Sequence, residues 1–410
     1  MKINEERLKW MKFLAIAVLL MYTVIKGVIP GWSEIKTDFP NYYVSAKSVV
    51  EGEDLKKLYN NQWFQAKIYE HQIDAWGKFS PQPPLTALLM TPIASLSPMA
   101  AKRTWLCLNL LFLCVSIILI REIFQLSWTS SILAMLLMGR ALANDLNYGQ
   151  IYVFITVMIL LSIWLVKKYN FQMIAGTILA IAMWLKYFPV VFILYALFNR
   201  QFKLVVASAA TVVVLLLAQF YFFGTEVNQF YFLEILPAHL SGNIPGQGGY
   251  AISYQSWPSL LNNLFVYDEV NNPNPVLGWA TGKWISLTLI YLVTTGFLLQ
   301  LIVKKFSSEE KKSEIVLILL IISGLALLPA TARYHFMFLL IPVCLLLRKE
   351  INLPVVSMIF LIFAINIFPY PFADNGSFLM LLLSYPRLLA LNLLLLLIYT
   401  TQTRIKWETH

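Results

Sequence analysis

Residues 171–203 read FQMIAGTILAIAMWLKYFPVVFILYALFNRQFK, and this stretch decides the fold. Between residues 171 and 198, Lys186 is the single charge. One straight helix over these residues would be about 42 Å long, whereas the hydrocarbon core of a bilayer is about 30 Å thick. Pro189 lacks a backbone donor and clashes with the turn before it. We therefore expect two short helical arms, a re-entrant pair, that meet at residues 186–189 with Lys186 toward the outer half of a membrane.

The composition of the whole chain agrees with a membrane protein. Of 410 residues, 59% are apolar and 13% are charged, too few charges to cover a soluble protein of this length. The apolar residues form blocks of about 17 to 25, the length of a membrane-spanning helix. The net charge of +10 comes from Lys and Arg at the ends of these blocks, as the positive-inside rule requires. Nucleic acid is therefore not an expected partner, and the lipid bilayer is.

The basic residues also predict the topology. Lys2, Arg7, Lys9 and Lys12 precede the first apolar block, which places the N-terminus in the cytoplasm. No small-residue cleavage site follows, so this block is a retained helix. The expected membrane segments are 10–29, the short element 84–97, 102–121, 128–143, 150–166, the two arms of 171–198, 204–223, 283–303, 315–330, 334–347, 353–368 and 379–402.

Every basic cluster beside a hairpin then falls inside, including Lys304, Lys305, Arg404 and Lys406. The first external loop covers residues 30–83, and the second, which has no Lys or Arg, covers 224–280. We thus predict an all-α polytopic protein of the cell membrane (the inner or plasma membrane), with one domain over 1–410. It has about twelve membrane segments and both termini in the cytoplasm.

Polar side chains with possible chemistry gather in the external regions. Asp38 lies in TDFPNYY, directly after the first helix and beside Tyr42 and Tyr43. A carboxylate next to aromatic rings suits a general base that faces a sugar hydroxyl. The alternative is a helix N-cap, because Asp38 precedes Phe39 and Pro40, and proline favours the first turn. Spacing alone leaves both interpretations open.

Other external segments are rich in hydrogen-bonding groups for a substrate. Gln82 lies among prolines in FSPQPPL, and Asn144 and Gln150 bound the predicted external turn NDLNYGQ. Gln255 and Trp257 follow a glycine-rich stretch that resembles a mobile cover over a substrate. Each segment also has an ordinary interpretation as a turn, a loop or a linker.

Three cations suggest a phosphate site. Arg333 and His335 in TARYHFMFLLIP stand at the outer end of a helix, where positive-inside anchoring gives no reason for an arginine. Together with Lys186 they could bind a phosphate. The alternatives are a structural histidine and a lysine that snorkels from a helix end. No metal is demanded. A divalent cation on Glu51, Glu53 and Asp54 stays open, although a solvated face is the favoured interpretation of these residues.

The order of these motifs resembles the polyprenyl-phosphate-mannose-dependent mannosyltransferases of glycosyltransferase family 87. The resemblance rests on Asp38-Phe39, Tyr42-Tyr43, Leu58-Tyr59, the stretch 79–85, Gly149-Gln150, the stretch 185–189, Gln255-Ser256, Arg333 and His335. It implies a GT-C fold and an inverting transfer from a lipid-phosphate sugar on the extracytoplasmic side. It also implies that Asp38 is the catalytic base, that His335 lies near the donor phosphate, and that Lys186 is the family lysine.

The expected function is therefore transfer of a sugar, mannose by resemblance, from a polyprenyl-phosphate donor to a lipid or glycan acceptor. No cofactor is required by this chemistry. A transporter or flippase of a lipid-linked or polar solute is the main alternative, because a charged break in a helix also suits transport. A non-enzymatic subunit of a glycan-assembly complex is the second. Against transport, the sequence has no evident inverted repeat, and its polar residues gather at one face.

Overall fold

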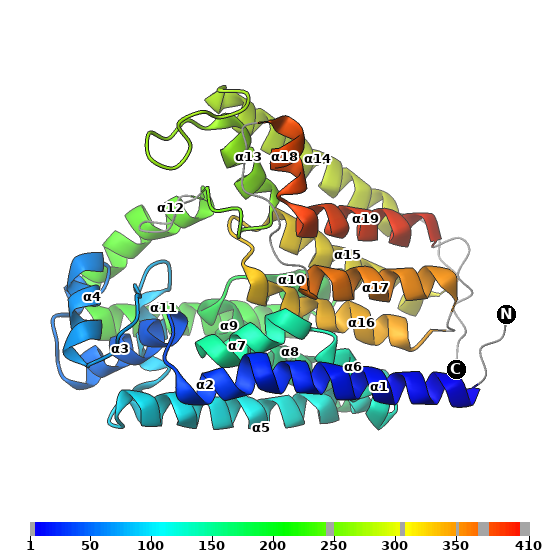
Figure 1. Ribbon diagram of the computed structural model, residues 1–410, viewed down its shortest axis with the longest axis horizontal. Helices are drawn as coiled ribbons and strands as arrows, with labels where there is room; N and C mark the ends of the chain where they lie inside the picture. Colours follow the sequence, from blue (N-terminus) through cyan, green and yellow to red (C-terminus); the bar gives the residue numbers. More distant parts are fainter. Residues whose placement is uncertain (1–4, 243–249, 304–307, 350–351, 368–376, 402–410) are drawn as a thin grey trace. The chain divides into compact units, whose positions relative to one another are not determined.

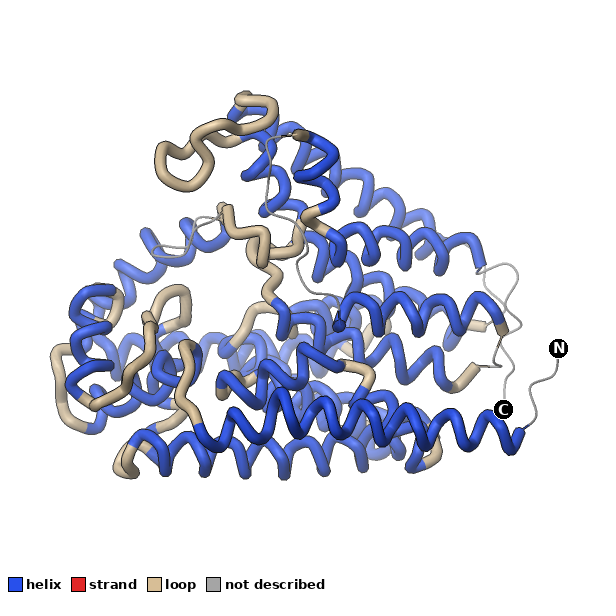
Figure 2. Tube along the Cα trace, viewed as in Figure 1, coloured by secondary structure: helices blue, strands red, loops and turns tan. Residues whose placement is uncertain are grey.

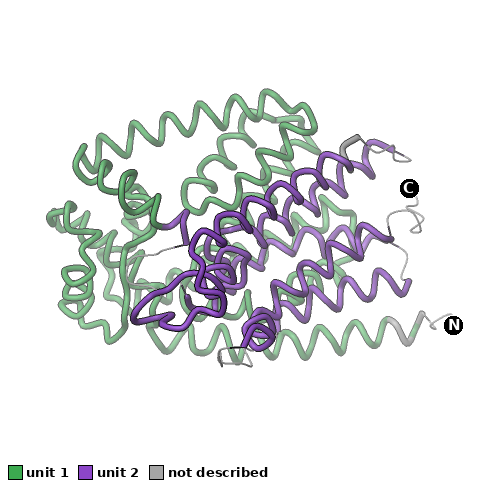
Figure 3. Tube along the Cα trace, turned by 90° about the horizontal axis from the view of Figure 1, so that it is seen from above, with its two compact units in different colours: residues 1–238 green, residues 239–410 purple. Residues whose placement is uncertain are grey.

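The computed structural model describes residues 5–242, 250–303, 308–349, 352–367 and 377–401. Within these ranges the backbone forms helices joined by loops, with one isolated antiparallel bridge between Asp268 and Asn272 (Figure 2). The predicted all-α class is confirmed for this part of the chain. Contacts divide the protein into two compact units, Met1–Ala238 and His239–His410 (Figure 3). The single domain over 1–410 stays a prediction.

Unit 1 begins with a helix longer than the predicted 10–29. Helix α1 (Glu5–Thr23) continues through a π-helical turn, η1 (Val24–Val28), into α2 (Ile29–Ser33), and this rod lies along α5 and α7 (Figure 1). Glycines allow the close approach. A Cβ on Gly31 would lie 2.6 Å from the Leu146 carbonyl oxygen, so a side chain at this position would push the two helices apart.

The first external loop is largely helical. Helix α3 (Asp38–Val50) and the 3₁₀ turn η2 (Leu55–Lys57) lead to α4 (Asn61–Glu70). The Asn60 side chain caps α4 by accepting bonds from the backbone N–H groups of Gln62 and Trp63 at 3.1 and 3.0 Å. The short element expected at 84–97 consists of two 3₁₀ helices, η3 (Pro84–Leu88) and η4 (Thr91–Ile93), which pack on α3.

Two predictions in the next segment are wrong. Helix α5 (Pro98–Phe124) is followed by α6 (Trp128–Leu136) and α7 (Gly139–Tyr148), so the single helix expected over 128–143 is broken in two. Gly139 has a φ of +43° at the break, a conformation that glycine adopts without strain. The expected external turn at 144–150 is helical up to Tyr148 and turns only at Gly149, before α8 (Tyr152–Tyr169).

The break at Lys186 is confirmed. Helix α9 (Gln172–Leu185) ends there with extended backbone angles, φ −150° and ψ 130°, and α10 (Val190–Phe198) begins directly after Pro189. Both arms pack on α11 (Phe202–Phe230) and on each other. The orientation of this pair in a bilayer stays a prediction.

The beginning of the second external loop differs from expectation. Helix α11 continues past residue 223 through a non-helical Gly224 (φ 71°, ψ 175°), and η5 (Tyr231–Ile235) and α12 (Leu236–Leu240) extend it. Buried amides hold the kink, because Gln219 Nε2 donates to Asn228 Oδ1 at 2.6 Å and Asn228 Nδ2 donates to the Gly224 carbonyl at 2.6 Å. Residues 225–240, expected as loop, are therefore helical.

Unit 2 consists of further helices. They are α13 (Trp257–Phe265), α14 (Ala280–Val303), α15 (Glu309–Leu327), η6 (Arg333–Leu339), α16 (Leu340–Leu347), α17 (Leu353–Ile367), α18 (Phe378–Leu383) and α19 (Pro386–Thr401). The helix expected at 334–347 begins as a 3₁₀ helix, and the one expected at 379–402 breaks at Ser384–Tyr385. At one end of α15, Glu314 pairs with Arg348 and Lys349 at 2.7 and 3.1 Å.

Five of the described helices are long and apolar enough to cross a membrane. They are Lys9–Val50, Pro98–Phe124, Tyr152–Tyr169, Phe202–Leu240 and Ala280–Gln300, and shorter apolar helices accompany them. The chain is thus a membrane protein, while the count of about twelve segments and the orientation of the termini stay predictions. Lys2, Lys304, Lys305, Arg404, Lys406 and the glycine-rich residues 243–249 lie outside the described residues.

Candidate active site

Asp38 occupies the first position of α3 in unit 1. The residue at the N-cap is Thr37, whose side chain makes no capping bond, so the cap position considered for Asp38 belongs to its neighbour. Asp38 is half-buried, and Phe39 and Tyr42, which follow it on α3, are fully buried. The burial of Phe39 and Tyr42 fixes the start of α3, and the Asp38 carboxylate remains half-buried at the first position of this helix.

Tyr42 and Gln150 are brought together as a buried pair. The Tyr42 hydroxyl donates to Gln150 Oε1 at 2.9 Å, and the Trp105 indole donates to the Gln150 carbonyl at 3.1 Å. Tyr42 is 1% exposed and Gln150 is 4% exposed. These bonds join α3, α5 and the start of α8, so the two predicted substrate residues also fix the local structure.

Lys186 lies against the same tyrosine. Its Nζ atom is 5.7 Å from the centre of the Tyr42 ring and 5.5 Å from that of Tyr152, which suits cation–π attraction. The Lys186 ammonium also interacts electrostatically with the carboxylates of Asp38 and Asp145. The break after α9 therefore brings an ammonium group to the start of α3.

Two charged residues of this cluster were not predicted. Lys102, on α5, is fully buried, and its ammonium donates to the Asn147 carbonyl at 2.7 Å and lies 5.6 Å from the centre of the Phe39 ring. Asp145, on α7, accepts from the backbone N–H groups of Tyr152 and Val153 at 2.8 and 3.4 Å. Both lie at helix ends in the sequence, where charges are ordinary, so only their burial distinguishes them.

Asp145 is fully buried, and its side chain is a weaker acid than an ordinary aspartic acid. Burial raises the pKa of Asp145 to about 7, and the two backbone N–H donors and the charge of Lys102 oppose this rise. The cluster thus holds two carboxylates, Asp38 and Asp145, and two ammonium groups, Lys102 and Lys186. We define these four residues as the charged cluster.

Three other predicted residues of unit 1 have separate surroundings. The Tyr43 hydroxyl donates to the Leu96 carbonyl at 2.7 Å, and its ring stacks on Phe39. Gln82 and Asn144 are 6% and 8% exposed, and the Gln82 Oε1 and Asn144 Nδ2 atoms are buried without a hydrogen-bond partner among the described residues. Their contribution to substrate binding stays a prediction.

The remaining predicted residues belong to unit 2. His335 and Arg333 are half-buried at the start of η6, and the Ala332 backbone N–H donates to His335 Nδ1 at 3.1 Å. Nδ1 also lies 3.3 Å from the Ala332 carbonyl oxygen, so these contacts are compatible with either tautomer of a neutral imidazole. The contact of His335 to a phosphate oxygen stays a prediction.

Gln255 makes structural bonds within unit 2. Its Nε2 atom donates to the carbonyls of Ile252 and Ser384 at 2.7 and 2.9 Å, and its Oε1 atom accepts from the Arg387 backbone N–H at 3.0 Å. Trp257 is half-buried at the first position of α13. Gln255 thus ties the loop before α13 to the break between α18 and α19.

Arg387 is a further buried charged residue that was not predicted from the sequence. Arg387 is 1% exposed, and its Nε donates to the Ile365 carbonyl at 2.6 Å. Its guanidinium lies 5.5 Å from the centre of the ring of Phe336, the residue that follows His335 in the sequence. A charged residue within the apolar block 379–402 is the sequence feature that could have identified Arg387 as a candidate functional residue.

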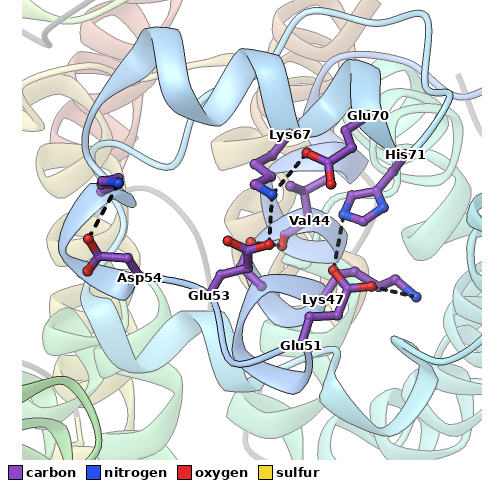
Figure 4. A network of polar contacts seen from close by, with 10 residues as sticks. Val44, Lys47, Glu51, Glu53, Asp54, Lys67, Glu70 and His71 are labelled. Carbon is purple, nitrogen blue, oxygen red and sulfur yellow. Dashed lines mark hydrogen bonds and ion pairs between the residues drawn. The ribbon is translucent and has the colours of Figure 1, made fainter.

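Three acidic residues of the first external loop, the possible cation ligands Glu51, Glu53 and Asp54, pair with basic residues (Figure 4). Glu53 accepts from Lys67 at 2.7 Å, Glu51 lies 3.4 Å from Lys47, and Asp54 lies 3.7 Å from Lys57. These carboxylates are between 30% and 47% exposed, consistent with a solvated face. Across the described residues no group of three or more His, Cys, Asp or Glu is arranged to hold a metal ion.

The described part of the fold thus defines the class as an all-helical membrane protein with a partly buried charged cluster. A model of glycosyltransferase family 87 matches residues 82–329, more than half of the chain, so the chain belongs to this family and is a glycosyltransferase. The matched range contains Lys102, Asp145 and Lys186, whereas Asp38, Arg333 and His335 lie outside it. No curated protein and no solved structure matches the chain.

Proposed function

We propose that this glycosyltransferase moves a sugar, mannose by resemblance, from a polyprenyl-phosphate donor to a lipid or glycan acceptor on the extracytoplasmic face of the cell membrane. The observation that carries the proposal is the charged cluster. In a chain of a glycosyltransferase family, the half-buried carboxylate of Asp38 interacts with the buried ammonium group of Lys102 and the half-buried one of Lys186, beside a tyrosine–glutamine pair.

Asp38 is the proposed general base. The acceptor hydroxyl attacks the anomeric carbon of the donor, the bond from that carbon to the phosphate oxygen breaks, and the sugar inverts its configuration. Asp38 takes the hydroxyl proton, and polyprenyl phosphate leaves with the bonding electrons. A positioned base of this kind accelerates proton transfer by about 10² to 10⁴.

The leaving phosphate needs compensation of its negative charge. Lys186, Arg333 and His335 are the proposed donors, because fixed cations stabilise a developing anion in a site that excludes water. A lipid-phosphate donor keeps its tail in the bilayer, so the proposed reaction does not call for a soluble nucleotide-binding domain. Tyr42, Gln82, Asn144, Gln150, Gln255 and Trp257 are the proposed contacts to sugar or acceptor.

The test is transfer by purified protein from polyprenyl-phosphate mannose, and from the corresponding glucose and galactose donors, to a membrane lipid extract. We expect wild-type protein to form a glycosylated product and to release polyprenyl phosphate, and Asp38→Ala to lose both. Full activity in Asp38→Ala would contradict the assignment of the base. Transport of the donor across vesicles without any transfer would instead support the flippase alternative.

A further inference from the structure

Lys102 is more deeply buried than a lysine near the end of a helix needs to be. Its side chain is 0% exposed, although it lies only four residues after the start of α5. A lysine there could extend into water at little cost. Instead its ammonium donates to the Leu146 and Asn147 carbonyls at 3.4 and 2.7 Å. A buried charge is tolerated where it is paired and hydrogen-bonded, so its location suggests a specific function.

The neighbouring glycine shows how closely this ammonium is held. Gly149 follows α7 with a φ of +68°, and a Cβ there would lie 2.8 Å from Lys102 Nζ and 3.0 Å from Phe39 Cβ. The backbone after α7 therefore approaches both Lys102 and the residue after Asp38. Only glycine combines this left-handed conformation with this approach.

Lys102 thus touches two helix ends at once. It bonds the carbonyls at the end of α7, and its Nζ lies 5.6 Å from the centre of the Phe39 ring at the start of α3. Its charge also interacts with the carboxylates of Asp38 and Asp145. We propose that Lys102 is a positioning residue for the general base: it fixes the start of α3 against the end of α7 and keeps Asp38 ionised. This inference rests on the proposed function of Asp38.

Other charged groups act on the same carboxylate. Lys186 is the second cation, and Asp145 is a carboxylate that opposes both. Tyr42 lies on α3 itself, and Lys36, just before α3, acts on Lys102. The other helix packed on α3 is α4, whose Lys67 and Glu70 pair with each other. The elements η3 and η4 carry no titratable side chain. Lys102 and Lys186 are therefore the cations that favour the charged base.

The experiment is the pH dependence of kcat/KM for transfer by Lys102→Met, which removes the charge and keeps the length. We expect the acid limb of the profile to move to higher pH by about one unit, because loss of a nearby cation favours the protonated carboxylic acid. The donor KM should change by less than about threefold, because Lys102 is not one of the proposed donor contacts. An unmoved acid limb, or an equal loss at every pH, would overturn the proposal.

Two variants control this experiment. Lys102→Arg keeps the charge and should keep the limb near the wild-type position. Arg103→Gln removes the adjacent positive charge, but that side chain is exposed and donates to the Trp32 carbonyl at 3.1 Å, so the profile should not move. A shift of similar size in Arg103→Gln would show a general charge effect and would contradict a specific contribution of Lys102.

Thermal unfolding in detergent gives a readout that does not depend on activity. We expect Lys102→Met to lower the Tm less in an Asp38→Asn background than in the wild-type background, because the two charges interact. If Lys102→Met alone does not fold, recovery of folded protein in the double variant would support the proposal, and equal failure would overturn it. Activity retained by Asp38→Ala would refute the proposed base, whereas this thermal coupling would be unchanged.

Discussion

The two units use their buried polar residues differently. In unit 1, Asp38, Lys102, Asp145 and Lys186 come from four segments, and their charges act on one another. In unit 2, Gln255 bonds backbone groups of Ile252, Ser384 and Arg387, and Arg387 itself bonds the Ile365 carbonyl. The first arrangement concentrates charge near a half-buried carboxylate, and the second satisfies the backbone at helix breaks.

This difference distinguishes residues proposed for the active site from residues that stabilise the fold, even where the two kinds look alike in the sequence. Gln150 and Gln255 are both buried glutamines beside glycine or serine. Gln150 accepts a bond from Tyr42, a ring that also lies under Lys186, whereas all the side-chain bonds that the structure gives Gln255 go to the backbone. Substitution of Gln150 should therefore lower turnover more, and substitution of Gln255 should lower stability more.

The largest effect is expected at Asp38. Asp38→Ala should lower kcat by about 10² to 10⁴, because the acceptor hydroxyl loses its base. His335→Ala in unit 2 should lower kcat less, because it removes one of several cations from the leaving group. Initial rates at saturating donor measure both. A larger loss in His335→Ala would reverse the comparison between the units.

The next effect concerns the proposed phosphate site. Lys186→Met and Arg333→Ala should each raise the donor KM by about 10- to 100-fold, because each removes a charged hydrogen-bond donor. If both cations bind one phosphate, the double variant should lose less than the product of the single losses. Strictly multiplicative effects would place the two residues at different sites.

Stability should distinguish the two glutamines. Gln255→Leu leaves the Ser384 carbonyl and the Arg387 N–H without their partner, at a cost of about 1 to 3 kcal/mol each. We expect a lower Tm, with a smaller loss of turnover in the folded fraction than Gln150→Leu shows, because the side-chain bonds of Gln255 go to the backbone. Gln150→Leu should reduce turnover as well, because the Tyr42 hydroxyl loses its acceptor. Normal turnover in Gln150→Leu would contradict its assignment to the active site.

A smaller effect tests burial in the first external loop. Lys78 is 1% exposed, and burial lowers the pKa of its ammonium group to about 7 from an ordinary 10.5. Between about pH 10.5 and pH 7 the Lys78 side chain is protonated in the unfolded chain but neutral in the folded protein. Lowering the pH over this range therefore stabilises the unfolded chain and reduces the free energy of unfolding. The Tm of wild-type protein should therefore decline from about pH 10 to pH 7 more steeply than that of Lys78→Met. Parallel curves would show that Lys78 does not titrate in this range.

The smallest expected effect is that of a chelator. Because Glu51, Glu53 and Asp54 lie near lysines, we expect EDTA to leave the transfer rate unchanged. A loss of activity that Mg²⁺ or Mn²⁺ restores would show that a divalent cation takes part. Glu53→Gln would then locate it, because this substitution removes the carboxylate that accepts from Lys67 without changing its size.

The sequence predicted one helix break correctly, because a charged residue and a proline stood within an apolar run. Lys186 and Pro189 interrupted an apolar run, and the helix breaks there. The same signal was present at Arg140, in the block 128–143, and at Arg387, where it was overlooked although the helices also break nearby. Residues 225–240 were misjudged because Glu226 and Asn228 look like loop residues, whereas the bonds of Asn228 to Gly224 and Gln219 stabilise a kinked helix.

The candidate site was predictable only in part. Asp38, Tyr42, Gln150 and Lys186 were identified by motif order, and the structure brings them together. Lys102 was missed, and Asp145 was recognised only as part of the polar turn NDLNYGQ, because lysine and aspartate at helix ends are normally solvated. Their place in the charged cluster follows from burial between α3, α5, α7 and α8, a property of the packing that no local sequence pattern contains.

The central claim is that Asp38, and not its neighbour Asp145, accepts the proton. The most direct measurement is the transfer rate of Asp38→Asn beside that of Asp145→Asn, with both proteins shown to be folded. Each variant removes one carboxylate of the charged cluster and keeps its shape. The account predicts a loss of about 10² to 10⁴ in Asp38→Asn and less than about tenfold in Asp145→Asn. The opposite order, or full activity in Asp38→Asn, would contradict it.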